Sequence, residues 1–264
     1  MIPRAQITAW RQTVPWADDG QVEQDLVLSR ALVELFPNSG QESNLVLRGG
    51  TALQKLLLVP PARYSEDIDL VQRRPEPIGD CLDRIRGSLD PWLGEARYKQ
   101  GRGGVTLAYR FQSESLPVRP LRLKIEINTR EHFSVHELAP AAFQVSNPWF
   151  SGQAMVLSYG ADELLGTKMR ALYQRRKGRD LFDLWLALDR GLVRPERVVD
   201  CFGRYMAAGG TPVGREDYAT NLMRKAEHPG FRGDVRPLLA SGQRFDFDAA
   251  VERVARELVS RLPE

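Results

Sequence analysis

Two aspartates stand one residue apart in an apolar stretch of this 264-residue chain, as Asp67 and Asp69 of YSEDIDLV. Successive side chains of a strand point to opposite faces, so both carboxylates and Ser65 share one face while the apolar residues between them enter a core. Burying an unpaired carboxylate is costly. With about 6.5 Å between their Cα atoms, the two carboxylates can converge on two divalent cations, Mg²⁺ or Mn²⁺. The alternative is a strand whose polar face is solvated.

A glycine pair precedes these aspartates, between the apolar residues Leu45–Leu47 and a helical segment over Thr51–Leu58. Glycine lets backbone amides approach a ligand closely, and the amino terminus of a helix attracts phosphate. The stretch RGGT therefore predicts a phosphate-binding turn formed by Gly49, Gly50 and Thr51. The alternative is a tight turn that uses glycine only for its backbone freedom.

A third acidic residue lies in Leu121–Asn128, LRLKIEIN, which alternates strictly between apolar and polar side chains. Such alternation predicts a strand with Lys124, Glu126 and Asn128 on one face. Glu126 could complete a carboxylate triad with the two aspartates, as a metal ligand or as the general base that acts on an attacking hydroxyl. The alternative is a polar outer face.

A lysine interrupts the apolar row of ADELLGTKMRALY, since Lys168 stands four residues from Leu164 and from Leu172. A lysine at such a helical position either extends its ammonium group to the rim or meets an anion. Lys168→Met keeps the apolar stem and removes the charge, so we expect the stability of this variant to hold or to rise slightly.

The stretch RRKGRDLFDLW follows. We expect Gly178 to end one helix and Asp180 to open the next as its N-cap, with Asp183 in the first turn. A densely basic set of residues surrounds the glycine, and Arg102 in GRGG is a further candidate of the same kind. These cations either stabilise a helix carboxyl terminus or bind phosphates of RNA or a triphosphate; the set comprises Arg175, Arg176, Lys177 and Arg179.

The elements that must position these residues fall into two groups. Strands are predicted over 45–47, 68–71, 95–99, 105–111 and 121–128, and helices over 21–36, 51–58 and 77–90, with Pro37–Gly40 ending the first helix. After about residue 155 only helices are predicted, over 161–176, 181–188, 195–206, 216–226 and 247–262. We therefore expect an α/β (α+β) domain with a mixed sheet over residues 1–150, followed by a helical domain over residues 151–264.

Composition narrows the class of protein. Hydrophobic residues make up 42% of the chain and charged residues 27%, which fits a folded protein with a sizeable core. The net charge is only +3, so any basic surface for a partner must be local. Cys81 and Cys201 suggest neither a disulfide framework nor a zinc site. No signal-like or membrane-spanning apolar run is visible, so we expect a cytoplasmic protein with no membrane partner.

The motifs LRGGTALQKL, RYSEDIDL, LKIEIN and ELLGTKMRALYQRRKGRDLFDL occur in this order. In this order they resemble the polymerase-β-type nucleotidyltransferase superfamily and, more narrowly, the AbiEii/AbiGii toxin family that includes the MenT toxins. The resemblance covers roughly residues 40–190. It departs from the wider superfamily in its third carboxylate, which is Glu126 where most members have aspartate.

This resemblance implies a bilobed fold and transfer of a nucleoside monophosphate from a nucleoside triphosphate with magnesium. For some members the acceptor is the 3′ end of tRNA, and the toxin is paired with an antitoxin, often a winged-helix DNA-binding protein. The resemblance also implies that Lys168 contacts the triphosphate, and that Asp180 or Asp183 belongs to the active site. Ser65 would bind triphosphate oxygens as well.

Two other hypotheses remain open from the sequence. One is a nucleotidyltransferase that modifies a protein or a small molecule, which the limited positive charge allows. The other is a catalytically silent module that binds a nucleotide or RNA, although the three acidic residues argue against a degenerate site.

Overall fold

The computed structural model describes residues 2–36, 43–101 and 103–264. Pro37–Gly40, expected to end a helix, and Arg102, a candidate basic residue, lie outside the described residues. The chain forms two compact units, Met1–Ser134 with Leu138–Tyr159, and Val135–Glu137 with Gly160–Glu264. Each unit is described by itself.

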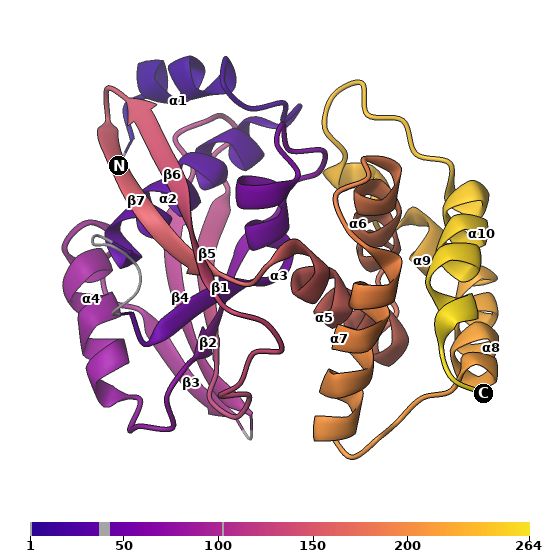
Figure 1. The fold of residues 1–264 in the computed structure, drawn as a ribbon. Coiled ribbons are helices and arrows are strands. Elements are labelled where there is room, and N and C mark those ends of the chain that lie inside the picture. The colour runs from indigo at the N-terminus through magenta and orange to yellow at the C-terminus, as the bar shows by residue number, and fades with distance from the viewer. Residues whose placement is uncertain (1, 37–42, 102) are drawn as a thin grey trace. The chain divides into compact units, whose positions relative to one another are not determined.

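The first unit is built on a seven-stranded sheet with the strand order β3-β4-β5-β2-β1-β7-β6 (Figure 1). Two neighbouring pairs, β2–β5 and β1–β7, are parallel and the others are antiparallel, so the predicted mixed sheet is confirmed. The strands are β1 Leu45–Arg48, β2 Asp67–Gln72, β3 Arg97–Gly101, β4 Gly104–Gln112, β5 Pro120–Asn128, β6 Ala139–Asn147 and β7 Phe150–Ser158.

The two acidic strands lie side by side near the middle of this sheet. β2 and β5 pair in parallel, and their apolar residues Ile68, Leu70, Ile125 and Ile127 are at most 1% exposed. Because these apolar side chains are buried, a shift of the pairing by one residue would expose them, so the register that fixes the apolar face also fixes the polar face.

Helices of the first unit pack against the sheet or shape its loops. α2, the longest, begins after Asp18, whose side chain accepts a hydrogen bond from the Gln21 amide, and it packs against β5, β6 and β7. The helix predicted after the glycine pair begins at Gly49 and continues into a π-helical turn. The bounds are α1 Arg4–Arg11, α2 Asp19–Leu35, α3 Gly49–Ala52, the π-helix Leu53–Leu57 and α4 Gly79–Leu93.

The hairpin β6–β7 was not predicted. Its strands carry many small and polar residues, and most of those on β6 are half-buried or exposed, so the apolar alternation that marks a strand is weak. The hairpin joins the sheet because β7 pairs in parallel with β1 at Leu47 and Ser158, whose hydroxyl donates to the Leu47 carbonyl oxygen over 2.9 Å. The boundary predicted at residue 150 falls at the start of β7.

The second unit is helical over its long segment. α5 packs against α6, α7 and α8, and α10 packs against α6 and α8. The five helices predicted in this part of the chain are found, and α9 was not predicted. The bounds are α5 Ala161–Gln174, α6 Gly178–Asp189, α7 Pro195–Ala208, α8 Arg215–Ala226, α9 Pro229–Gly233 and α10 Phe247–Glu257, with short 3₁₀ turns at Arg236–Leu238 and Val259–Arg261.

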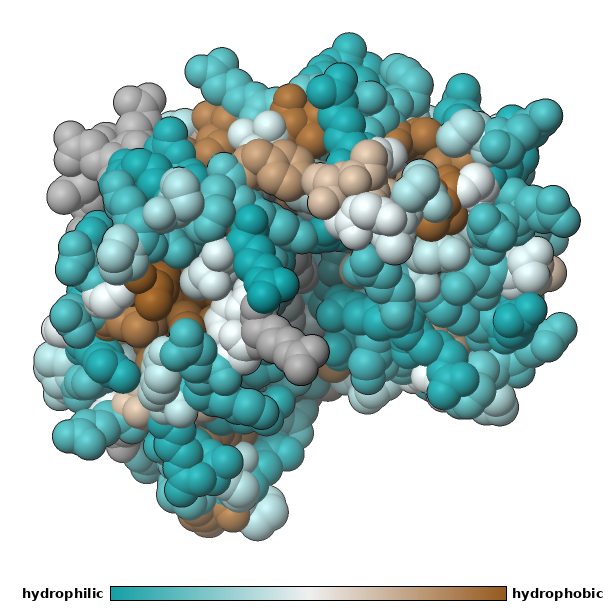
Figure 2. Space-filling model, turned by 90° about the horizontal axis from the view of Figure 1, so that it is seen from below, coloured by the Kyte–Doolittle hydropathy of each residue, from teal (hydrophilic) through white to brown (hydrophobic). Residues whose placement is uncertain are grey.

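The surface that Figure 2 shows is mostly hydrophilic, with apolar side chains gathered in small separate groups. Among the described residues, none of the helices combines the length and apolar character needed to cross a membrane.

Candidate functional site

The register of the sheet brings the three predicted carboxylates together in the first unit. β2 and β5 place Asp69 opposite Glu126, and they place Asp67 opposite Lys124. All four polar side chains are half-buried, so they lie at a solvent-accessible part of the sheet and not within its core. Asp67 and Asp69 therefore share one face of β2 as predicted, and Lys124 of β5 lies on the same face of the sheet.

Asp67 is the least satisfied of these carboxylates. Its Oδ1 atom is buried and has no hydrogen-bond partner among the described residues. The pKa of Asp67 is raised to about 6, mainly by burial; the charge of Lys124 opposes this rise, and the charges of Glu66, Asp69 and Glu126 add to it. A half-buried carboxylate with one buried, unpartnered oxygen and an elevated pKa lacks a full compensating positive charge.

Lys124 supplies part of that charge. Its Nζ atom lies 2.6 Å from Glu126 Oε1 and 4.0 Å from Asp67 Oδ2. In this arrangement Glu126 turns toward the lysine, and no three His, Cys, Asp or Glu side chains of the described residues form a group that could hold a metal ion. Asp67 and Asp69, on adjacent same-face positions of β2, fit a divalent cation through their oxygens, and Glu126 would join them by leaving Lys124.

The glycine turn lies directly beside these carboxylates. Gly49 has a φ of 77°, and a Cβ atom there would overlap the Asp69 carboxylate. A Cβ at Gly50 would lie 2.9 Å from Ser65 Oγ. Both positions exclude a side chain because the turn packs closely against Asp69 and Ser65, so the backbone at the amino terminus of α3 lies directly beside the carboxylates.

Thr51 has an internal role in addition. It is fully buried, and its hydroxyl donates to the Asp67 carbonyl oxygen over 2.6 Å and lies 3.0 Å from Ser65 Oγ. These contacts tie the glycine turn to β2. The Thr51 side chain therefore positions the turn.

A cavity of about 320 Å³ opens beside Asp69 and Glu126. It contains two cations, Arg48 and Lys99, together with the backbone of the β3–β4 turn. This combination of carboxylates and cations within one cavity suits a charged ligand of nucleotide size. The remaining lining residues are Leu70, Gly101, Gly103, Gly104, Val105, Thr106, Ile127 and Asn128.

A second cluster of candidate residues lies within the helical unit. Lys168 is 5% exposed, and its Nζ atom lies 3.1 Å from Asp180 Oδ1 and 3.2 Å from Asp183 Oδ2. Arg175 completes the cluster, because its Nε and Nη2 atoms donate to the two oxygens of Asp180 over 2.7 and 2.9 Å. Lys168 therefore meets anions of its own unit instead of extending to the rim. Because these anions are buried, we no longer expect Lys168→Met to keep its stability.

The charge state of Asp180 follows from these contacts. Burial alone would raise its pKa, but Lys168 and Arg175 outweigh burial and lower the pKa of Asp180 to about 2. The carboxylate is therefore ionised at neutral pH although none of it is exposed.

Two expectations about this stretch are wrong. α5 ends at Gln174, and Gly178 begins α6 instead of ending a helix. The N-cap of α6 is Lys177, so Asp180 lies inside the first turn and its side chain is used by Lys168 and Arg175. The reason for the glycine is close packing, since a Cβ atom at Gly178 would overlap the Phe231 carbonyl oxygen.

The basic residues of RRKGR do not act as one patch. Arg175 pairs with Asp180, Lys177 lies 3.6 Å from Asp234, and the Arg179 amide donates to Asp234. None of them belongs to the last turn of α5, whose end is instead bound by Lys225 through the carbonyl oxygens of Leu172 and Tyr173. Arg176 lines a separate cavity of the helical unit.

Sequence reasoning gave no role to three residues that shape the sheet site. Lys124 could have been found, because it shares a face with Glu126 in LKIEIN. Arg48 directly precedes the glycine pair and lines the cavity. Arg63 is 2% exposed, and its Nη2 atom would lie 2.8 Å from a Cβ at Gly50. No local pattern distinguishes such a buried arginine from a surface one.

Comparison with known proteins gives a consistent result. The family model described as nucleotidyl transferase AbiEii toxin, type IV TA system, matches residues 30–253. The nucleotidyltransferase toxin MenT4 from Mycobacterium tuberculosis H37Rv has a similar structure, with a TM-score of 0.62 and 18% identity over 99% of this chain and 91% of MenT4.

An antigenic nucleotidyltransferase-like protein from Paracoccidioides brasiliensis aligns with a TM-score of 0.40 and 16% identity, over 80% of this chain and 95% of that protein. No curated protein sequence matches the chain significantly.

Proposed function

Because the chain belongs to the AbiEii nucleotidyltransferase toxin family, we propose that it transfers a nucleoside monophosphate from a nucleoside triphosphate to the 3′ end of a tRNA. The family makes it an enzyme and the toxin of a toxin–antitoxin system, which sets aside the silent binding module. The tRNA acceptor, the divalent metal and an antitoxin of the winged-helix type are parts of the proposal. These substrates would place the reaction in the cytoplasm.

The observation that carries this proposal is the unsatisfied carboxylate Asp67. Its buried Oδ1 atom has no partner among the described residues, and Asp69 stands on the same face of β2. We propose that these two aspartates, joined by Glu126, hold Mg²⁺ or Mn²⁺. When bound, such a cation supplies Lewis-acid stabilisation of the charge that develops on phosphate oxygens.

The residues around the carboxylates would bind and orient the donor. The amides of Gly49, Gly50 and Thr51 belong to a helix amino terminus that attracts the triphosphate. Ser65 lies beside Gly50 and would bind a phosphate oxygen. A Glu126 side chain released from Lys124 could instead accept the proton of the attacking hydroxyl, which is within the role of a general base.

The helical unit enters the proposal through Lys168, Asp180 and Asp183. The family resemblance assigns them to the reaction, with the bilobed arrangement that it implies. Their mutual contacts support a narrower role, because both aspartates already bind the Lys168 ammonium group. We propose that Asp180 and Asp183 hold Lys168 ready for a triphosphate oxygen, and that exchange of one aspartate for that oxygen accompanies donor binding.

The test is transfer of label from each of four α-³²P nucleoside triphosphates to tRNA in the presence of Mg²⁺ or Mn²⁺. We expect label in the tRNA band with wild type, and none with Asp67→Asn, Asp69→Asn or a chelator. Periodate oxidation of the tRNA destroys the 3′-terminal diol and should abolish labelling. Label on protein or on a small molecule, with unlabelled tRNA, would favour the alternative acceptor instead.

A further inference from the structure

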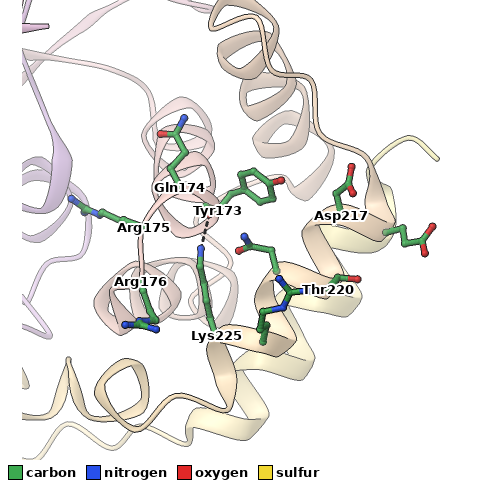
Figure 3. A pocket seen from close by; sticks show the side chains of 10 residues that line it. Tyr173, Gln174, Arg175, Arg176, Asp217, Thr220 and Lys225 are labelled. Atoms are coloured by element: carbon green, nitrogen blue, oxygen red, sulfur yellow. Dashed lines mark hydrogen bonds between the residues drawn. The ribbon is translucent and has the colours of Figure 1, made fainter. Parts of the chain in front are cut away.

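The helical unit contains a cavity of about 630 Å³ at the carboxyl end of α5 (Figure 3). One wall is the end of α5 with the two residues that follow it, and the other wall is α8. The lining residues are Tyr173, Gln174, Arg175, Arg176, Glu216, Asp217, Thr220, Asn221, Arg224 and Lys225.

The wall formed by α8 is a polar stripe. Asp217, Thr220, Asn221 and Arg224 follow the helical spacing of three and four residues, so they share one face. Tyr218 and Leu222 are buried on the opposite side of this helix.

The two walls are joined by specific contacts. Lys225 bridges from α8 to the end of α5, as Figure 3 shows by its bond to the Tyr173 carbonyl oxygen. The Tyr218 hydroxyl donates to the Met169 carbonyl oxygen over 2.9 Å. These hydrogen bonds hold the two walls of the cavity in place relative to each other.

Several polar side chains of this cavity have no polar partner among the described residues. The side chains of four residues, Arg176, Thr220, Asn221 and Arg224, form no hydrogen bond or ion pair with any described residue. Arg175 differs from them, because it binds Asp180. A cavity in which two arginines and two neutral polar groups remain open offers charge and directed hydrogen bonds to a ligand.

The charges of the cavity are separated along α8. Glu216 and Asp217 stand in its first turn, and Arg224 and Lys225 stand in its last. Asp217 and Arg224 are therefore two turns apart, about 10.5 Å along the axis. In Figure 3, Asp217 lies on one side of Tyr173, and Arg176 and Lys225 lie on the other.

Resting on the proposed function, we propose that this cavity binds a ribonucleotide unit of the acceptor RNA. Arg176 and Arg224 bind its phosphate, as arginine commonly does in nucleic-acid complexes. The Tyr173 ring stacks on its base, which is sequence-tolerant because every base has a π face. Asp217 accepts a hydrogen bond from the ribose 2′-hydroxyl, the group that distinguishes RNA from DNA.

The charge balance favours a phosphodiester over the donor triphosphate. Among the described residues that line the cavity, Arg176 and Arg224 are the open cations, which suits one or two phosphate charges. The acidic pair Glu216 and Asp217 repels a ligand with more negative charge. A transferase with two substrates needs a second site, and in the proposed function the donor already uses the glycine turn of the sheet unit.

The experiment is equilibrium binding of a fluorescent single-stranded RNA by anisotropy, with a chelator and without nucleoside triphosphate. The double variant Arg176→Gln with Arg224→Gln should bind about tenfold more weakly. Its salt slope should flatten by about 0.7 for each phosphate that the variant no longer binds. Arg236→Gln is the matched control, because Arg236 is also exposed and lies outside the cavity lining.

Two further arms identify the ligand. Wild type should prefer RNA to DNA of the same sequence, and Asp217→Asn should reduce that preference. Free nucleoside monophosphate should compete only at much higher concentration than the oligonucleotide, and equal competition would assign the cavity to a free nucleotide instead.

The proposal is overturned if wild type does not bind RNA, if the double variant binds as wild type does, or if Arg236→Gln weakens binding equally. This assay needs no transfer activity. An inactive protein whose RNA binding depends on Arg224 would refute the proposed function and keep this site, and an active protein with unaltered binding in the double variant would do the reverse.

Discussion

Asp67 of the sheet unit is half-buried and Asp180 of the helical unit is fully buried, and the pKa values of these two carboxylates move in opposite directions. Asp180 has Lys168 and Arg175 in direct contact, and its pKa falls to about 2. Among the described residues, the cation near Asp67 is Lys124, which lies at 4.0 Å and is shared with Glu126, and the pKa of Asp67 rises to about 6. In the helical cluster, the positive charges of Lys168 and Arg175 balance the negative charges of Asp180 and Asp183. Around Asp67 the negative charge is not balanced, and a bound cation could balance it.

The largest effect is expected from Lys168→Met. Removing the ammonium group leaves two buried aspartates without their shared cation, which should destabilise the protein by about 3–5 kcal/mol. Urea unfolding measures this loss. Lys177→Met is the matched control, since Lys177 is exposed and its pair with Asp234 is long at 3.6 Å, so it should change stability by less than about 0.5 kcal/mol. An unchanged stability of Lys168→Met would mean that Lys168 makes no net contribution in this cluster.

Asparagine substitutions at the two aspartates should have opposite signs at pH 8 without divalent cations. Asp180→Asn removes a carboxylate whose charge is stabilised by two cations, and a pKa change of about two units corresponds to a loss of about 2–3 kcal/mol. Asp67→Asn removes an uncompensated charge and should stabilise the protein by up to about 3 kcal/mol. Both values come from urea unfolding, and the same sign for both variants would refute the comparison.

A divalent cation should act on the sheet site alone. At a hundredfold excess over its Kd, Mg²⁺ or Mn²⁺ should stabilise wild type by about 2.7 kcal/mol. Asp67→Asn should lose most of this gain, because it lacks one anionic ligand. Thermal unfolding with and without the metal measures the difference, and Asp83→Asn is an exposed control that should keep the full gain.

The smallest effect is the pH dependence, at most about 1.4 kcal/mol per pH unit for one group. The folded-state pKa of Asp67 is raised, so its contribution is fully present below about pH 4 and is lost as the pH rises through about 6. The folded-state pKa of Asp180 is lowered, so its contribution is present above about pH 4 and is lost as the pH falls through about 2.

The difference in the free energy of unfolding between wild type and each asparagine variant isolates the contribution of the aspartate that was replaced. The difference between wild type and Asp67→Asn should change between pH 4 and 6. The difference between wild type and Asp180→Asn should be flat in that range and change only below it.

Local pattern was enough to predict the parts of the site that lie on strands. The alternation of LKIEIN and of SEDIDLV fixes which side chains share a face, and the parallel register of β2 and β5 then brings Asp69 to Glu126. The glycine turn was predictable for the same reason, since its backbone requirement is local.

Partnerships between distant or weakly patterned segments were not predictable. Asp180 was interpreted as an N-cap because its binding to Lys168 depends on how α5 packs against α6. The hairpin β6–β7 was missed because its position depends on pairing with β1. The α8 wall of the cavity in the helical unit lies beyond all of the motifs, and only the tertiary structure brings Arg224 into the same cavity as Arg176.

The parallel pairing of β2 with β5 also has a consequence for synthesis of the toxin. Asp69 meets Glu126 only after the intervening hairpin β3–β4 has been made, because β5 follows it in the chain. Strands that pair over a long separation form late, since loop closure costs entropy before the contacts repay it. A nascent chain that has not yet emerged from the ribosome through Asn128 therefore lacks the complete carboxylate site, and the cell that makes this toxin has that interval before the triad can assemble.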